Sequence, residues 1–211
     1  MRYDGVKTLL VVAVAACAAA PPPPISNRPE GASEAIPSLF APLFRPRTWS
    51  FSGETRVGGD RNNHTTRSSP VDCAIKSTRT LTHAWLADFA CTGIVADQPI
   101  DGTLIATTAG LWHVTEPIGA ITDATVAKLS PLAMLIDADP HPREHTTAVT
   151  DTEQESFAVV AAGKGWCASY ATNSGDDRGW TICLDATNGL VGGRAFWSGN
   201  ETTTTQFGAV P

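Results

Sequence analysis

The chain has no long hydrophobic run and no cluster of basic residues. Its N-terminal apolar run, Leu9–Ala16, is far shorter than the roughly 20 residues that a helix needs to cross a bilayer. The 15 basic and 21 acidic residues give a formal net charge of −6. Because nucleic-acid binding depends on basic side chains that displace the counterions of phosphate groups, we expect no nucleic-acid partner.

Several signatures of common enzyme and metal classes are also missing. The sequence contains no G-x-S-x-G motif, no phosphate-binding glycine loop and no dinucleotide-binding fingerprint. Its five cysteines include no C-x-x-C pair, which argues against a structural zinc site. No long amphipathic helix is evident, which argues against folds that alternate strands and helices. The sequence therefore predicts no cofactor, and it favours a protein that is not an enzyme.

The N-terminus has a basic start, a short apolar run and then small residues before a cysteine. Arg2 and Lys7 precede the apolar run, which ends in Val14-Ala15-Ala16-Cys17. This order resembles the signal peptide and lipobox of bacterial lipoproteins, over the first seventeen residues only. The resemblance implies that residues 1–16 are removed and that the thiol of Cys17 receives a diacylglyceryl group.

The same resemblance implies where the protein is located in the cell. Ala18, not an acidic residue, follows Cys17, which in that family favours the outer membrane, with the domain facing the periplasm or the cell surface. The membrane is then a partner through the lipid anchor. A secreted form cut after Ala20 is the alternative, although Pro21 would then follow the cleaved bond.

Acylation of Cys17 leaves four cysteines, and an exported protein is expected to oxidise them to disulfides. Four cysteines allow three pairings. Strand alternation favours Cys73–Cys91 and Cys167–Cys183, because each pairing gives a coherent antiparallel register. In the second hairpin this register places Tyr170 opposite Trp180. In the first it places Ile75 opposite Phe89 and Lys76 opposite Asp88, with the disulfide on the apolar face.

Composition predicts a mainly β fold in a single antiparallel domain over residues 47–211, preceded by a Pro-rich tether at residues 17–46. A curved sheet or incomplete barrel is the favoured architecture, a β-sandwich is the alternative, and at most one or two short helices are expected. The apolar residues 36–44 should pack onto the domain. Asn188-Gly189 predicts a two-residue hairpin turn, and residues 123–129 predict a short helix capped by Asp123. The expected strands are residues 49–57, 71–80, 84–94, 103–114, 156–162, 166–172, 179–186, 190–197 and 202–207.

One motif suggests metal chemistry. His141-Pro142-Arg143-Glu144-His145 fits H-x-x-E-H, in which two histidines on one face of a helix hold zinc and the glutamate acts as a base. The flanking prolines and the β-branched residues after His145 disfavour the helix that this chemistry requires. An exposed polar loop is the simpler interpretation, so His141 and His145, with Asp137 and Asp139 nearby, are only weak candidates for metal binding.

The six tryptophans, spread over separate expected strands, either supply core area or line a ligand cavity. Three functions follow from these features. The first is a lipid-anchored envelope protein with a non-catalytic binding or structural role, acting on an unidentified envelope protein or ligand. The second is a carrier of an apolar ligand in a β cavity, and the third is a small metal-dependent hydrolase that uses His141, Glu144 and His145.

Overall fold

The computed structural model describes residues 35–60, 63–94, 100–150, 153–173, 177–199 and 201–210. These belong to one compact unit, Glu34–Pro211. The lipobox, Cys17 and the proline-rich segment before residue 35 lie outside the described residues. No helix in the described ranges has the length and apolarity needed to cross a membrane.

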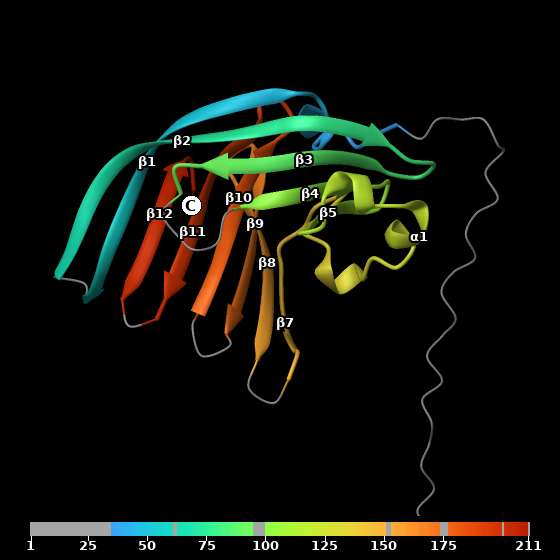
Figure 1. Cartoon of the computed structure of the whole chain (residues 1–211). Coiled ribbons are helices and arrows are strands. Elements are labelled where there is room, and N and C mark those ends of the chain that lie inside the picture. The colour runs from blue at the N-terminus through green and yellow to red at the C-terminus, as the bar shows by residue number, and fades with distance from the viewer. Residues whose placement is uncertain are drawn as a thin grey trace, which may run out of the picture. The chain divides into compact units, whose positions relative to one another are not determined.

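A single antiparallel sheet contains all the strands of the described structure (Figure 1). The strands are β1 (Arg47–Asp60), β2 (Asn63–Thr80), β3 (Trp85–Thr92), β4 (Asp101–Ala106), β5 (Gly110–Val114), β6 (Ile136–Asp137), β7 (Arg143–Ala148), β8 (Gln154–Ala162), β9 (Gly165–Asn173), β10 (Asp177–Asp185), β11 (Gly189–Ser198) and β12 (Thr202–Gly208). The one α-helix of this region is α1 (Asp123–Val126), and short 3-10 helices span Ala41–Phe44, Ile118–Ala120 and Pro131–Ala133.

The strand order is β6-β5-β4-β3-β2-β1-β12-β11-β10-β9-β8-β7. Every neighbouring pair is therefore consecutive in the chain except β1 and β12, which join the first strand to the last. The sheet curls into a half-barrel whose two edges are β6 and β7 (Figure 1). This confirms the expected curved sheet or incomplete barrel rather than a β-sandwich. We call the gap between β6 and β7 the seam.

Both predicted disulfides are present. Cys73 pairs with Cys91 and Cys167 with Cys183, each across directly opposed residues whose Cα atoms are 4.0 Å apart. The second hairpin has the predicted register, including Tyr170 opposite Trp180. In the first hairpin the register shifts after Ile75, so Asp88 faces Ser77 and not Lys76. The predicted Lys76–Asp88 pair was wrong because a β-bulge adds a residue to one strand.

Four local predictions were also wrong. Residues 103–114 form β4 and β5, not one strand, because the chain turns at residues 107–109, where the Thr107 hydroxyl accepts from the Ala109 amide. The strand β7 was not predicted, since residues 141–145 were interpreted as a loop. Thr122, not Asp123, caps α1, and its hydroxyl accepts a hydrogen bond from the Thr125 amide.

The fourth wrong prediction is the two-residue hairpin turn at Asn188-Gly189. Asp185 pairs with Gly189, so the loop contains three residues, and only Gly189, at φ +72°, has the left-handed conformation. A two-residue turn of the predicted kind needs positive φ at both central residues. The Asp185 carboxylate instead accepts from the backbone amides of Thr187 and Asn188. Burial tends to raise the pKa of Asp185, but these hydrogen bonds outweigh it and lower the pKa below its ordinary value.

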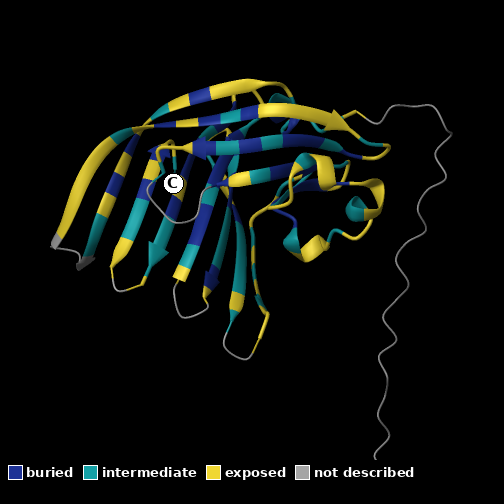
Figure 2. Cartoon of the chain, viewed as in Figure 1, coloured by how far each residue is buried: buried dark blue, intermediate teal, exposed yellow. Residues whose placement is uncertain are grey.

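Two hydrophobic clusters lie on opposite faces of β3–β5. The larger cluster lies inside the curl and extends across the sheet to Phe207 of β12. The smaller one packs the outer face of β3–β5 against the segment that contains α1. Buried residues gather along the middle of the strands, and the hairpin tips are mainly exposed (Figure 2).

Residues before β1 belong to the folded unit. Phe40 and Leu43 are fully buried in the larger cluster, which confirms that residues 36–44 pack onto the domain. The later part of residues 17–46 therefore contributes to the core, as expected from its apolar residues.

Candidate functional site

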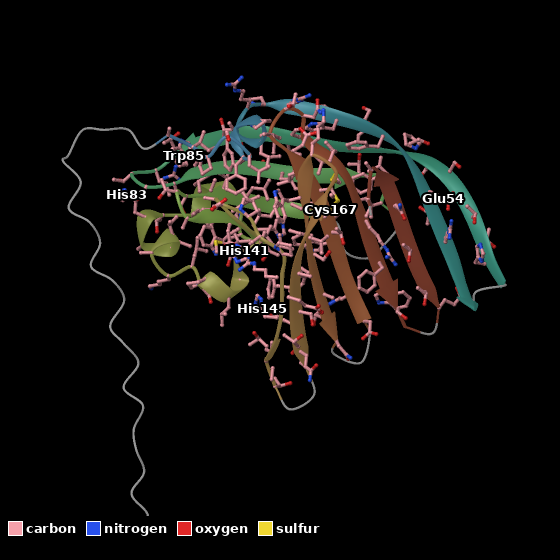
Figure 3. The ribbon with its side chains drawn as sticks, turned by 180° about the vertical axis from the view of Figure 1, so that it is seen from behind. Glu54, His83, Trp85, His141, His145 and Cys167 are labelled. Carbon is pink, nitrogen blue, oxygen red and sulfur yellow. A yellow bond between two sulfur atoms is a disulfide. The ribbon has the colours of Figure 1, made fainter. Side chains whose placement is uncertain are left out.

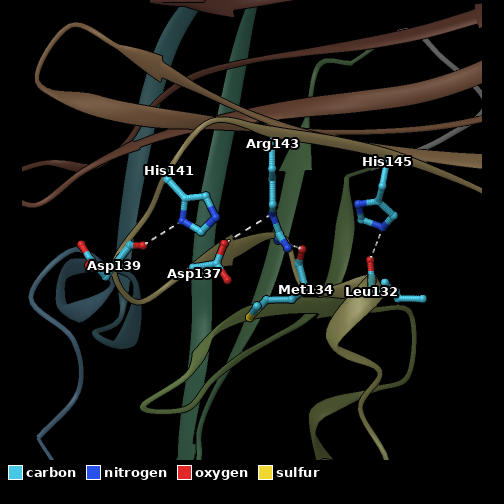
Figure 4. Close-up of polar contacts among 7 residues, drawn as sticks. All are labelled: Leu132, Met134, Asp137, Asp139, His141, Arg143 and His145. Carbon is cyan, nitrogen blue, oxygen red and sulfur yellow. Dashed lines mark hydrogen bonds and ion pairs between the residues drawn. The ribbon is translucent and has the colours of Figure 1, made fainter. Parts of the chain in front are cut away.

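The H-x-x-E-H residues lie at the seam, in β7 and the loop before it (Figure 3). Alternation along β7 leaves Glu144 exposed and half-buries Arg143 and His145. The two imidazoles contact different backbone carbonyls, with Arg143 between them (Figure 4). His141 Nδ1 lies 3.5 Å from the Asp139 oxygen, and His145 Nε2 donates to the Leu132 oxygen at 2.7 Å. The described residues contain no group of three or more His, Cys, Asp or Glu side chains that could hold a metal.

Side chains from β7 connect the two edges of the sheet at the seam. A guanidinium nitrogen of Arg143 donates to the Met134 carbonyl, and Arg143 Nε lies 3.4 Å from an Asp137 carboxylate oxygen. That ion pair lacks hydrogen-bond geometry, since both of its atoms are buried without a hydrogen-bond partner in the described structure. With the His145–Leu132 bond, these contacts hold β7 beside the segment that precedes β6.

A row of rings crosses the inner face of the sheet. His145, Phe157, Tyr170 and Trp180 occupy directly opposed positions on β7, β8, β9 and β10. Neighbouring ring centroids are 5.2 Å, 5.2 Å and 5.9 Å apart. On the other side of the curl, His113 of β5 meets Trp180 edge-on at 5.2 Å. The aromatic row therefore links both walls of the half-barrel.

A polar row runs beside the aromatic row on the same face of the sheet, two residue pairs nearer the β9–β10 turn. It consists of Glu155, Thr172 and Arg178, which are directly opposed on β8, β9 and β10. The polar and aromatic rows both contribute to an open cavity of about 550 Å³ inside the half-barrel. Val114, Ala133 and Leu135 complete its apolar lining, and the exposed residues Asp101 and Glu116 also line it.

Two side chains of the polar row have no partner in the described structure. Thr172 is only 5% exposed, yet its hydroxyl makes no hydrogen bond there. The other three buried polar side chains, Thr55, Thr103 and Thr205, are all hydrogen-bonded. Arg178 is half-buried and forms neither an ion pair nor a hydrogen bond through its side chain with any described residue. Unsatisfied buried polar groups are rare in native proteins and call for an explanation.

Burial sets the protonation of the two titratable rings in the cavity. It lowers the pKa of His113, although the Asp101 carbonyl that accepts from His113 Nε2 at 2.8 Å and the nearby carboxylates act in the opposite direction. Burial raises the pKa of Tyr170 to about 12, helped by the hydrogen bond that its hydroxyl donates to Glu155 at 2.9 Å. Both rings are therefore neutral at pH 7.

Most tryptophans serve the core and not the cavity. Trp49 and Trp112 are buried, and their indole nitrogens donate to the carbonyls of Asn188 and Ser130. Trp85 and Trp166 pack partly buried against the larger cluster. Trp180 alone among the tryptophans at described positions lines the cavity inside the half-barrel.

A second hollow, of about 840 Å³, lies on the opposite sheet face over β1, β2, β11 and β12. It is larger, but its charged groups are exposed, and Arg56 is already paired with Glu54 at 2.6 Å. Glu54 lies far from His141 and His145 across the sheet (Figure 3). None of the buried unpartnered side chains of the described structure lines this hollow. We therefore take the cavity inside the half-barrel as the candidate site.

No protein-family model matches this chain, and no curated protein matches it either.

The sequence predicted only part of this cavity. The cysteine register placed Tyr170 opposite Trp180, and the same register extended by two residues places Thr172 opposite Arg178. The expected strand began at residue 179, so Arg178 was excluded from it. The contribution of β5 depends on how the sheet curls, which local alternation does not reveal.

Proposed function

We propose that this protein is a lipid-anchored envelope protein with a non-catalytic binding role, and that it holds a small amphipathic ligand inside the half-barrel. The observation that carries the proposal is a cavity with an aromatic row on one wall and a buried, unpartnered Thr172 hydroxyl. Ligand pockets combine apolar and aromatic walls with a few polar groups that fix orientation, and their usual volumes are about 300–1,000 Å³. The cavity volume of about 550 Å³ falls in that range.

The proposal combines two expectations from the sequence, a binding role and a carrier with a β cavity. The anchor rests on the resemblance of Val14-Ala15-Ala16-Cys17 to a lipobox, and the outer membrane on Ala18. The arrangement of β7 does not favour the hydrolase alternative. Glu144 lies on the exposed face, while His145 is engaged with Leu132 and stacked on Phe157.

The binding role can be tested with an uncharged probe. We expect 2-(2-naphthyl)ethanol to bind the detergent-solubilised mature protein saturably with one-to-one stoichiometry, measured by calorimetry against a matched detergent blank. Ala133→Phe should weaken this binding, because Ala133 lines the cavity. The matched control is Ala148→Phe, since Ala148 is exposed at the end of β7. Absence of binding by the folded wild-type protein would contradict the proposed role.

The anchor needs a separate measurement. The intact mass of the protein extracted from membranes should correspond to a chain that begins at Cys17 and carries acyl groups. Cys17→Ser should abolish both the added mass and this processing. An unacylated mass for the wild-type protein would overturn the anchor without bearing on the cavity.

A further inference from the structure

We propose that the cavity recognises an anionic amphiphile, with Arg178 and Thr172 binding its carboxylate and the aromatic row contacting its apolar body. This inference rests on the proposed function, because it assumes that the cavity is a ligand site. It adds the charge of the ligand and the side chains that select it.

Arg178 is the first reason to expect an anion. Its side chain is half-buried, it lines the cavity, and it pairs with no acidic group of the described residues within 4.0 Å. A half-buried cation without a partner loses part of its hydration and gains nothing in return. A guanidinium binds a carboxylate with two parallel hydrogen bonds, which are short and strong because both groups are charged.

Thr172 is the second reason, and it is independent of charge. Its hydroxyl is buried in the cavity wall directly opposite Arg178, and no described group accepts or donates a hydrogen bond there. A carboxylate held by Arg178 would lie near this hydroxyl, which can then donate to one of its oxygens. One ligand group would thus satisfy two side chains that have no hydrogen-bond or ion-pair partner among the described residues.

The acidic residues of the cavity are less suited to bind a cationic ligand than Arg178 and Thr172 are to bind an anionic one. Glu155 already accepts a hydrogen bond from the Tyr170 hydroxyl at 2.9 Å. Asp101 and Glu116 are exposed, so water and salt screen their charges. Arg178 is the one cationic side chain among the described residues that line the cavity, and unlike Glu155 it has no hydrogen-bond or ion-pair partner among them.

The two rows also fix the orientation of the ligand. Arg178 and Thr172 lie near the β9–β10 turn, whereas Tyr170 and Trp180 lie two residue pairs further along the strands, where Trp180 joins the larger core cluster. A ligand would therefore place its apolar body over the aromatic row and its carboxylate toward the strand ends. The rings of Phe157, Tyr170 and Trp180 are tilted relative to one another, and such rings make favourable edge and offset contacts with flat aromatic groups.

Three naphthalene probes of similar size but different charge test whether the cavity selects an anion. We expect 2-naphthylacetate to bind about tenfold more tightly than 2-(2-naphthyl)ethanol, and 2-(2-naphthyl)ethylamine to bind more weakly than either. Arg178→Gln should reduce the affinity for 2-naphthylacetate about tenfold and leave the affinity for 2-(2-naphthyl)ethanol unchanged. Thr172→Val should reduce acetate affinity by about threefold. Raising the salt concentration should weaken binding of the acetate alone.

Arg194→Gln is the matched control, since Arg194 is an exposed arginine on the opposite sheet face and should leave all three affinities unchanged. If the ethanol binds as tightly as the acetate, the charge inference is overturned and the proposed binding role stands. If 2-(2-naphthyl)ethylamine binds more tightly than 2-naphthylacetate, the charge inference is also overturned, and Glu155 becomes the residue that selects the charge of the ligand. If no probe binds the folded protein, the proposed function itself fails.

Discussion

Among the single residues of the cavity, Tyr170 connects the aromatic row to the polar row. Its ring lies between Phe157 and Trp180, with centroids 5.2 Å and 5.9 Å away, and its hydroxyl donates to Glu155. The aromatic ring of Tyr170 thus packs against apolar neighbours while its hydroxyl forms a hydrogen bond in the same site. Because the hydroxyl acts as a donor, this arrangement depends on the tyrosine being protonated.

We predict that ionisation of Tyr170 lowers the free energy of unfolding at alkaline pH. Burial and the bond to Glu155 raise the pKa of Tyr170 from 10.0 to about 12 in the folded protein. Folding therefore favours the protonated ring, so this contribution is complete below pH 10 and is lost as the pH rises from 10 to 12. Tyr170→Phe should reduce the free energy of unfolding by about 1 kcal/mol at pH 8 through the lost hydrogen bond.

Urea unfolding of both proteins at pH 8 and at pH 11 measures this effect. The difference between wild type and variant should be smaller at pH 11, because the wild-type protein alone loses the tyrosine contribution. The other tyrosine, Tyr3, belongs to the segment that the proposed processing before Cys17 would remove, so an ultraviolet titration of a chain that begins at residue 17 reports Tyr170 directly. A phenol that titrates near pH 10 would contradict the environment described for this residue.

At the scale of secondary-structure elements, the alternation of apolar residues predicted the central strands well. Around Cys167 and Cys183 the apolar and polar residue types alternate in the sequence, and the opposed cysteines fixed the register of that hairpin, although Ala168, Ile182 and Leu184 are buried beside the cysteines. The edge strand β7 was missed because it contains only polar residues and one alanine, Arg143-Glu144-His145-Thr146-Thr147-Ala148. Such a strand forms through pairing with β8 and stacking of His145 on Phe157, contacts that are invisible along the chain.

We predict that Arg143 holds β7 at the seam. Arg143→Met should increase hydrogen exchange of the β7 amides by about 10- to 100-fold, since a hydrogen bond from a charged donor contributes roughly 1.5–3 kcal/mol. His145→Phe should have a smaller effect, because a phenyl ring retains the stacking on Phe157 and loses only the bond to Leu132.

The reference in this experiment is the disulfide-bonded hairpin of β9 and β10, whose exchange should not change in either variant. Arg143→Met also leaves the Asp137 carboxylate without its ion-pair partner. The double variant Arg143→Met/Asp137→Asn separates that charge effect from the lost bond to Met134. Unchanged exchange in β7 would show that pairing with β8 alone positions this strand.

At the scale of the whole molecule, the chain forms two meanders, β1–β6 and β7–β12, that join where β1 pairs with β12. Each disulfide lies within one meander, with sequence separations of 18 and 16 residues. Neither disulfide therefore connects the two halves. They are joined by the β1–β12 ladder, by the larger hydrophobic cluster and by the contacts at the seam. The ladder includes the hydrogen bond between the hydroxyls of Thr55 and Thr205.

Phe207 provides the apolar part of that union. It is 1% exposed, its ring lies 5.3 Å from that of Phe51, and it is opposed by Gly53 of β1 and Gly193 of β11. A Cβ atom on Gly193 would come within 2.4 Å of the Phe207 ring, and one on Gly53 within 2.6 Å of Val71. The two glycines leave the space that this ring and its neighbours need at the junction of the meanders.

We predict that Phe207→Ala destabilises both halves together. Truncation of a fully buried phenylalanine should reduce the free energy of unfolding by about 3–5 kcal/mol. Because β1 and β12 form the only strand ladder between the meanders in the described sheet, amides of β2–β3 and of β9–β10 should lose protection by the same factor. Phe196→Ala is the control, since Phe196 lies on the other face of the sheet and is only half-buried, and its effect should be smaller. Loss of protection confined to β9–β12 would mean that the two meanders are separate folding units, each stabilised by its own disulfide.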